Sequence, residues 1–326
     1  MFLMALDGGK TKTSCVLFNE RGNILALSSS GPSGLILPLD TIKKNILKAI
    51  TDCLLKVGIK IEDVDVIVLG LADLDTERDR ERAQEVVKSL SLPPSIRIIV
   101  EHDAVVAYYA VTYGKPGIAV IAGTGSIAFG MNEYGERARS SGWGWLFGDE
   151  GSAFWIAREA LMLAAKAYDG RGSKTKLTDA LIREFKIKDF LSIIDVVYKD
   201  LKGDPGNIAK IAELVDKVAI EGDKIAYGIM KRAGIELALS AYAVAEKLGM
   251  VNKRIVVGGV GSVFNSSIVK ETFYDWLKSR LRNAIFKPPL IGYQPIIGSV
   301  VLALRALGLN YREVAERIER IKCQLS

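Results

Sequence analysis

The sequence predicts a two-domain α/β protein, and three observations lead to this fold class. The chain has 326 residues, which is long for one domain and comfortable for two. Apolar runs typical of buried strands alternate with segments of helical period. A strand, a glycine turn and a second strand occur at residues 3–18 and again at 118–131, which suggests an internal duplication. With a boundary at Gly114–Gly117, we expect domains at 1–114 and 115–326, and the last helices could pack back on the first domain.

The first domain is predicted to open with three antiparallel strands. The expected strands are Phe2–Leu6, Cys15–Phe18, Ile24–Leu27, Val64–Leu71 and Ile96–Val100, and the expected helices are 41–57, 76–90 and 103–112. Asp40 is expected to cap the first helix. Asp7, the loop Asp73–Asp75 and His102-Asp103 each follow a strand. They should therefore share the carboxyl edge of the sheet, where open α/β sheets bind their ligands.

The second domain repeats the opening pattern and adds a large helical block. Its expected strands are Ile118–Ala122, Ile127–Met131 and Arg254–Val257, and its expected helices are 153–168, 267–283, 295–308 and 311–323. Residues 173–249 are helical by period. The sequence does not explain this block, and a dimer surface is one interpretation, so we expect a homodimer.

Composition narrows the class of protein further. The net charge is +6, but acids and bases are interleaved, which favours a solvated surface over a nucleic-acid site. No apolar run approaches the ~18 residues of a membrane span, and no signal segment precedes the first strand, so we expect a cytoplasmic protein. Gln is scarce and Lys, Arg and Glu are plentiful, which fits a thermophile.

The first glycine turn, Asp7-Gly8-Gly9, follows a buried strand. Glycine amides beside a carboxylate suit a polyphosphate with its magnesium ion, since the amides bind the anion and the carboxylate binds the water shell of the metal. An ordinary hairpin turn explains the same residues equally well. A P-loop does not, because Met4 stands where the first glycine is required and a strand follows instead of a helix.

Asp103 lies between a strand and a helix, so it can be a helix N-cap or, in a phosphotransferase, a general base. His102 is the only histidine, and no GxSxG motif accompanies it, which disfavours a serine hydrolase. His102 is expected to pack or to orient its neighbour.

Asp149 and Glu150 open a helix, where acids match the helix dipole. Trp143 and Trp145 stand among glycines just before them. Aromatic faces beside carboxylates that accept from hydroxyl groups also suit a sugar-binding surface.

Two glycine hairpins and a late Gly-Gly turn together resemble the ATPase fold shared by actin and sugar kinases. The motifs DGGKTKT, EHDA, AGTGS, GWGWLFGDEGSAFWIAREAL and VVGGV, in this order over essentially the whole chain, resemble the N-acetylglucosamine kinase/BadF-BadG-BcrA-BcrD ATPase family. The similarity is greatest to archaeal broad-specificity hexokinases of that family. It implies a two-domain actin-like ATPase (ribonuclease H-like) fold with duplicated β-hairpin phosphate loops, and an ATP-dependent sugar kinase that phosphorylates a 6-hydroxyl.

The resemblance also implies roles for particular residues. Asp103 would be the general base, and Asp7 would hold Mg²⁺ through water. The ATP-binding residues would be Asp7, Gly8, Gly9, Lys10, Thr11, Lys12, Gly123, Thr124, Gly125, Ser126, Gly258, Gly259 and Val260. The sugar-binding residues would be Asp75, Asp103, Gly123, Thr124, Asp149 and Glu150. The expected partners are ATP and a sugar, with no nucleic acid and no membrane.

Three residues depart from the family pattern: Lys10 replaces a glycine, Gly34 stands where an Asn often binds the sugar, and Asp73 replaces a glycine. Lys10 can supply a cation near the phosphates or only its amide. An activator ATPase of acyl-CoA dehydratases and a sugar sensor are the alternatives. The first would need paired cysteines for an Fe–S cluster, and the second a preceding helix-turn-helix.

Overall fold

The computed structural model describes residues 1–9, 12–74, 76–292 and 296–325, and the chain divides into two compact units. Unit 1 contains Met1–Gly117 together with Gly292–Ser326, and unit 2 contains Ile118–Ile291. The end of the chain thus belongs to the same unit as its beginning.

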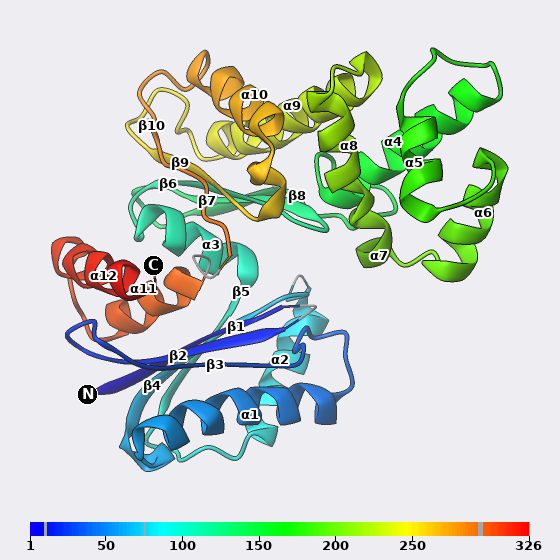
Figure 1. The fold of residues 1–326 in the computed structure, drawn as a ribbon. Coiled ribbons are helices and arrows are strands. Elements are labelled where there is room, and N and C mark those ends of the chain that lie inside the picture. Colours follow the sequence, from blue (N-terminus) through cyan, green and yellow to red (C-terminus); the bar gives the residue numbers. More distant parts are fainter. Residues whose placement is uncertain (10–11, 75, 293–295, 326) are drawn as a thin grey trace. The chain divides into compact units, whose positions relative to one another are not determined.

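A five-stranded sheet forms the centre of unit 1 (Figure 1). Its order is β3-β2-β1-β4-β5, with β1 at Phe2–Gly8, β2 at Thr13–Asn19, β3 at Ile24–Ser30, β4 at Val64–Leu71 and β5 at Arg97–His102. β1 is antiparallel to β2 and parallel to β4, and β4 is parallel to β5. Both faces of β1 are covered, which is why Leu3–Leu6 is an uninterrupted apolar run with at most 1% exposure.

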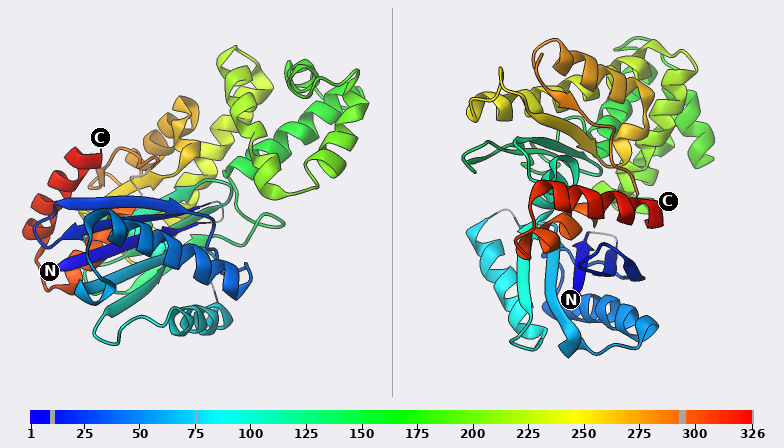
Figure 2. Two further views of the ribbon diagram at one scale, coloured as in Figure 1. Left: turned by 60° about the horizontal axis from the view of Figure 1, so that its bottom comes forward. Right: turned by 90° about the vertical axis from the view of Figure 1, so that its left-hand side faces the viewer.

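Helices cover both faces of this sheet (Figures 1 and 2). α1 (Leu39–Val57) and α2 (Glu77–Ser89) share a hydrophobic core with one face. α3 (Asp103–Thr112) and α11 (Ile297–Ala306) pack on the other face, and α12 (Tyr311–Leu325) follows them. The predicted cap at Asp40 is wrong, because Pro38 is the N-cap residue and Asp40 lies in the first turn of the helix.

Unit 2 repeats the strand order of unit 1. Its sheet has the order β10-β9-β6-β7-β8, with β6 at Gly117–Ala122, β7 at Ser126–Met131, β8 at Arg137–Ser141, β9 at Val256–Val260 and β10 at Ile285–Phe286. β6, β7 and β8 take the places of β1, β2 and β3, and β9 and β10 take those of β4 and β5. The duplication predicted from the two hairpins therefore extends to both five-stranded sheets. β8 and β10 were not predicted.

The remaining helices of unit 2 surround one large core. They are α4 (Ala153–Tyr168), α5 (Leu177–Phe185), α6 (Ile193–Asp195), α7 (Pro205–Ala209), α8 (Ile211–Ile220), α9 (Lys224–Lys247) and α10 (Ser267–Lys278). The predicted helical block therefore consists of several short helices and the long α9. Across the described ranges, no helix combines the length and the apolar character that a membrane span requires.

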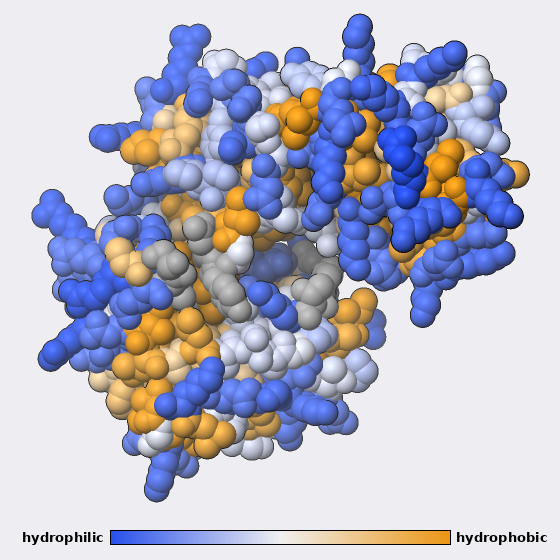
Figure 3. All heavy atoms as spheres, in the orientation of Figure 1, coloured by the Kyte–Doolittle hydropathy of each residue, from blue (hydrophilic) through white to orange (hydrophobic). Residues whose placement is uncertain are grey.

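Hydrophilic side chains are spread over much of the face shown in Figure 3. Many charges pair with an opposite charge one helical turn away, as in Lys48–Asp52 (2.9 Å) and Lys322–Glu319 (2.9 Å). This arrangement fits the solvated surface expected from the interleaved acids and bases.

Candidate active site

The carboxyl ends of three parallel strands bring the predicted acids of unit 1 to one edge. In the register of the sheet, Asp7 lies opposite Gly70, and Leu71 lies opposite His102. Asp103 is the next residue along the chain and begins α3. The expectation that Asp7 and His102-Asp103 share a sheet edge is confirmed.

The turn after β1 is held by backbone hydrogen bonds. The Gly9 amide donates to the Lys12 carbonyl (2.9 Å), and the Ser33 amide donates to the Gly9 carbonyl (3.2 Å). A side chain at Gly8 would overlap Ser33 Oγ, so this position needs glycine. The Gly9 amide thus closes the turn, although the sequence suggested that it would bind an anion.

Three predicted site residues, Lys10, Thr11 and Asp75, lie outside the described residues. The role of Lys10 therefore stays a prediction, as does the assignment of Asp75 to the sugar.

The Asp7 carboxyl group is buried, and its pKa is affected by the acid Asp103 and the base Lys12. Burial raises the pKa of Asp7 to about 6, the nearby Asp103 carboxylate contributes to the rise, and Lys12 opposes it. Within the described ranges, no group of three or more His, Cys, Asp or Glu side chains could enclose a metal ion. A single, poorly solvated carboxylate suits a cation that takes its other ligands from water and a bound phosphate.

The cap of α3 is His102 and not Asp103. His102 Nδ1 accepts a hydrogen bond from the Ala104 amide (2.8 Å). The N-cap interpretation of Asp103 is therefore wrong. Asp103 occupies the first helical position, its side chain is 37% exposed, and its Oδ1 lies 2.9 Å from His102 Nδ1. The carboxylate is accessible to a substrate, as a general base must be.

The glycine turn of unit 2 is anchored to the start of α4. The Gly123 amide donates to the Gly125 carbonyl (2.9 Å), and the Ala153 amide donates to the Gly123 carbonyl (2.8 Å). Ser126 Oγ donates to the Glu150 carbonyl (2.8 Å), so this hydroxyl holds the neighbouring segment. Within the described part of the chain, the Thr124 and Gly125 amides donate to no other protein group, which leaves them available to an anion.

Asp149 lies directly over this turn. It is 8% exposed and has a left-handed backbone (φ 56°). The Gly144 amide donates to its Oδ1 (3.2 Å), and its Oδ2 would lie 2.6 Å from a Cβ atom at Gly125. The helix-dipole interpretation is wrong, because α4 begins at Ala153 with Ser152 as its cap and has no acid in its first turn.

If Asp149 binds the sugar, as the sequence resemblance implies, Gly125→Ala should weaken sugar binding. The added methyl group would displace the Asp149 carboxylate, so we expect KM for the sugar to rise at least ~10-fold, comparable to the loss of one charged hydrogen bond. Steady-state kinetics with varied sugar would measure this. Gly228→Ala is the control, because a Cβ atom at this α9 position meets open space and should leave KM unchanged. An unaltered KM in Gly125→Ala would argue against Asp149 as a sugar ligand.

The third glycine segment of unit 2 is more buried than expected. Gly258–Val260 end strand β9, and the Gly259 carbonyl accepts a hydrogen bond from the Leu290 amide (3.0 Å). The chain first becomes accessible at Gly261, whose backbone (φ 110°) and close approach to the Ala122 carbonyl (2.5 Å from an added Cβ) both require glycine. Gly261 was not among the predicted ATP-binding residues, although it directly follows Gly258, Gly259 and Val260 in the sequence.

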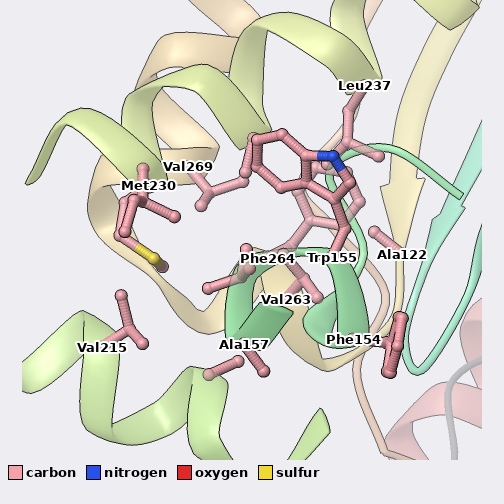
Figure 4. Close-up of a cluster of buried hydrophobic side chains, with 14 of the residues drawn as sticks. Ala122, Phe154, Trp155, Ala157, Val215, Met230, Leu237, Val263, Phe264 and Val269 are labelled. Atoms are coloured by element: carbon pink, nitrogen blue, oxygen red, sulfur yellow. The ribbon is translucent and has the colours of Figure 1, made fainter. Parts of the chain in front are cut away.

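One hydrophobic cluster supports all three segments of unit 2 (Figure 4). Ala122 precedes the glycine turn, Phe154 and Trp155 follow the acidic segment, and Val263 and Phe264 follow Gly261. Because these side chains pack together, the three loops are fixed relative to one another within the unit.

Trp143 and Trp145 lie on the surface, with 61% and 47% exposure. The Trp145 ring meets Phe154 edge to face (5.5 Å between centroids), and the Arg139 guanidinium lies over the Trp143 ring (5.3 Å). Their exposure beside Asp149 fits a ligand-binding surface better than a core.

Two units with the same strand order, each with a glycine turn beside a carboxylate, define the two-unit α/β architecture of actin-like ATPases. The chain belongs to the BadF/BadG/BcrA/BcrD ATPase family, whose model matches residues 6–303. The predicted family and the predicted fold are thus confirmed.

Individual relatives are similar over most of their length. An N-acetylmuramic acid/N-acetylglucosamine kinase of Clostridium acetobutylicum is 34% identical over 81% of this chain and 86% of its own. An N-acetyl-D-glucosamine kinase of Dictyostelium discoideum is 33% identical over 76% of this chain and 80% of its own. The crystal structure of a candidate N-acetylglucosamine kinase from Chromobacterium violaceum has a TM-score of 0.75 and 25% identity, and covers 93% of this chain and 98% of its own.

Proposed function

We propose that this protein transfers the γ-phosphoryl group of ATP to the 6-hydroxyl of a hexose or N-acetylhexosamine. The observation that carries the proposal is the accessible Asp103 carboxylate at the carboxyl edge of the sheet, beside Asp7, in a member of an ATPase family. Relatives named as N-acetylmuramic acid and N-acetylglucosamine kinases support the sugar acceptor.

In this proposal, residues of unit 1 accept the hydroxyl proton and hold the metal ion. Asp103 accepts the proton of the sugar hydroxyl while the hydroxyl oxygen forms its bond to the γ-phosphorus and the bond from that phosphorus to ADP breaks. Asp7 fits Mg²⁺ held through water, because burial and Asp103 leave its charge poorly compensated. When bound, Mg²⁺ neutralises charge that develops on the phosphate oxygens.

The residues of unit 2 bind the two substrates. The Thr124 and Gly125 amides bind phosphate oxygens, and the turn at Gly261 contacts the nucleoside. The Asp149 carboxylate accepts hydrogen bonds from sugar hydroxyls, with Glu150 next to it and the exposed Trp143 and Trp145 as apolar faces.

The alternative role as an activator of acyl-CoA dehydratases receives no support from the cysteines. Cys15 and Cys53 are buried in unit 1. Of the three cysteines only Cys323 is exposed, so they offer no exposed pair to an Fe–S cluster. The expected homodimer stays a prediction.

A coupled ADP-release assay across candidate sugars tests the proposed function. Glucose, mannose, glucosamine, N-acetylglucosamine and N-acetylmuramic acid should be compared at saturating ATP and Mg²⁺. We expect sugar-dependent ADP release with at least one of them, and N-acetylglucosamine is the first candidate because both relatives carry it in their names. If no sugar raises ADP release above the sugar-free rate, the proposal fails.

A further inference from the structure

We infer that His102 is a positioning residue that keeps the Asp103 carboxylate available as the general base by capping helix α3 in its place. The inference rests on the proposed function, in which Asp103 accepts the proton of the sugar hydroxyl. His102 does not itself need to contact either substrate.

The first turn of a helix contains amides without partners inside the helix, and a nearby acceptor normally satisfies them. At the start of α3, His102 Nδ1 is that acceptor, at 2.8 Å from the Ala104 amide. Asp103 carries the only carboxylate in this first turn and is the obvious competitor for the amides. In the described part of the chain, no backbone amide is paired with it.

The cap supplied by His102 affects both the basicity and the orientation of the Asp103 carboxylate. A carboxylate that accepts hydrogen bonds from backbone amides is stabilised as an anion and is a weaker base. Such bonds would also turn the Asp103 carboxylate toward its own helix and away from a substrate. With the cap supplied by His102, the Asp103 side chain stays 37% exposed.

The same contact defines the protonation state of His102. A neutral imidazole has one nitrogen that accepts and one that donates. Because Nδ1 accepts from the Ala104 amide, the proton of the neutral ring belongs on Nε2. A proton on Nδ1 would instead be donated to Asp103 Oδ1, 2.9 Å away, and would occupy the base. This role of His102 therefore requires the neutral ring with an unprotonated Nδ1, in which Nδ1 and Asp103 Oδ1 repel each other and the carboxylate turns away from the ring.

Two substitutions of His102 distinguish the effect of the helix cap from that of the imidazole ring. In His102→Asn, the amide oxygen can accept from the Ala104 amide as a strong N-cap, so kcat should stay within about threefold of the wild type. In His102→Ala the cap is lost, so kcat should fall at least ~10-fold while KM for ATP and for the sugar changes less than about threefold. Thermal melting of both variants establishes that they are folded.

A double-mutant cycle tests whether His102 acts through Asp103. His102→Ala in the Asp103→Asn background should cause no further loss of kcat, because the base is already absent. Since His102 is the only histidine, its ¹⁵N shifts can be assigned without ambiguity, and they should show Nδ1 unprotonated at the pH of the assay.

Four results would overturn the inference. These are a wild-type kcat in His102→Ala, an equal loss in His102→Asn and His102→Ala, an additive loss on top of Asp103→Asn, and a protonated Nδ1. The Asp103→Asn variant distinguishes this failure from that of the proposed function. If it retains wild-type turnover, the general base itself is wrongly assigned. If it loses turnover and His102→Ala does not, only the role of His102 is refuted.

Discussion

Asp103→Asn is expected to lower kcat at least ~100-fold, while KM for ATP and KM for the sugar stay within about threefold. Asn keeps the size of the side chain but cannot take a proton. Because His102 supplies the cap of α3, the substitution removes no cap and should leave the fold intact. Steady-state kinetics with each substrate varied in turn would separate a change in kcat from a change in KM.

Asp52→Asn is the matched control for this variant. Asp52 is an acid of unit 1 on α1 that pairs with Lys48, and its replacement should leave kcat unchanged. If Asp103→Asn raised both KM values and kept kcat, Asp103 would be a binding residue, and another group would have to accept the hydroxyl proton.

Asp7→Asn is expected to stabilise the protein without ligands while it abolishes magnesium-dependent ATP binding. The pKa of Asp7 is raised from 3.8 to about 6, so the folded state holds this proton more tightly than the unfolded state. The free energy of unfolding therefore falls as pH rises from about 4 to about 6 and then levels off. Above that range the charged group destabilises the fold by up to about 3 kcal/mol, which a neutral Asn would not.

Urea unfolding with a metal chelator present would measure this effect. At about pH 7.5, Asp7→Asn should be the more stable protein, and at about pH 4.5 its advantage should shrink to about 1 kcal/mol. Glu81→Gln on α2, which removes an exposed charge from the same unit, should keep the pH dependence of the wild type. A destabilised Asp7→Asn at both pH values would show that the carboxylate has a structural role in place of metal binding.

Much of the fold follows from local sequence patterns. Long apolar runs such as Val64–Leu71 and Ile118–Ala122 are buried on both sides, and their length and composition alone predict strands. β8 was missed because Arg137–Ser141 has no apolar alternation, and β10 because it has only two residues. Both strands exist because they pair with longer neighbours, which is a tertiary effect.

The site was predictable only in part, because some of its contacts also join residues that are distant in sequence. Parallel strands that end at one edge were enough to place Asp7 near Asp103. The close approach of the Asp149 side chain to Gly125 joins residues that are distant in sequence, and no local pattern contains it. The sequence offered Asp103 as a possible cap of α3 and not His102, because Asp is a common N-cap and His is not.

The central claim is phosphoryl transfer to a sugar hydroxyl, and identification of the product tests it most directly. The enzyme should be incubated with ATP, Mg²⁺ and N-acetylglucosamine, or the best sugar of the panel, and the products followed by ³¹P and ¹³C NMR. We predict ADP together with a phosphate ester on C6 of the sugar, and no ester in the Asp103→Asn reaction over the same time. ADP accompanied only by inorganic phosphate would show an ATPase that does not phosphorylate sugars and would contradict the claim.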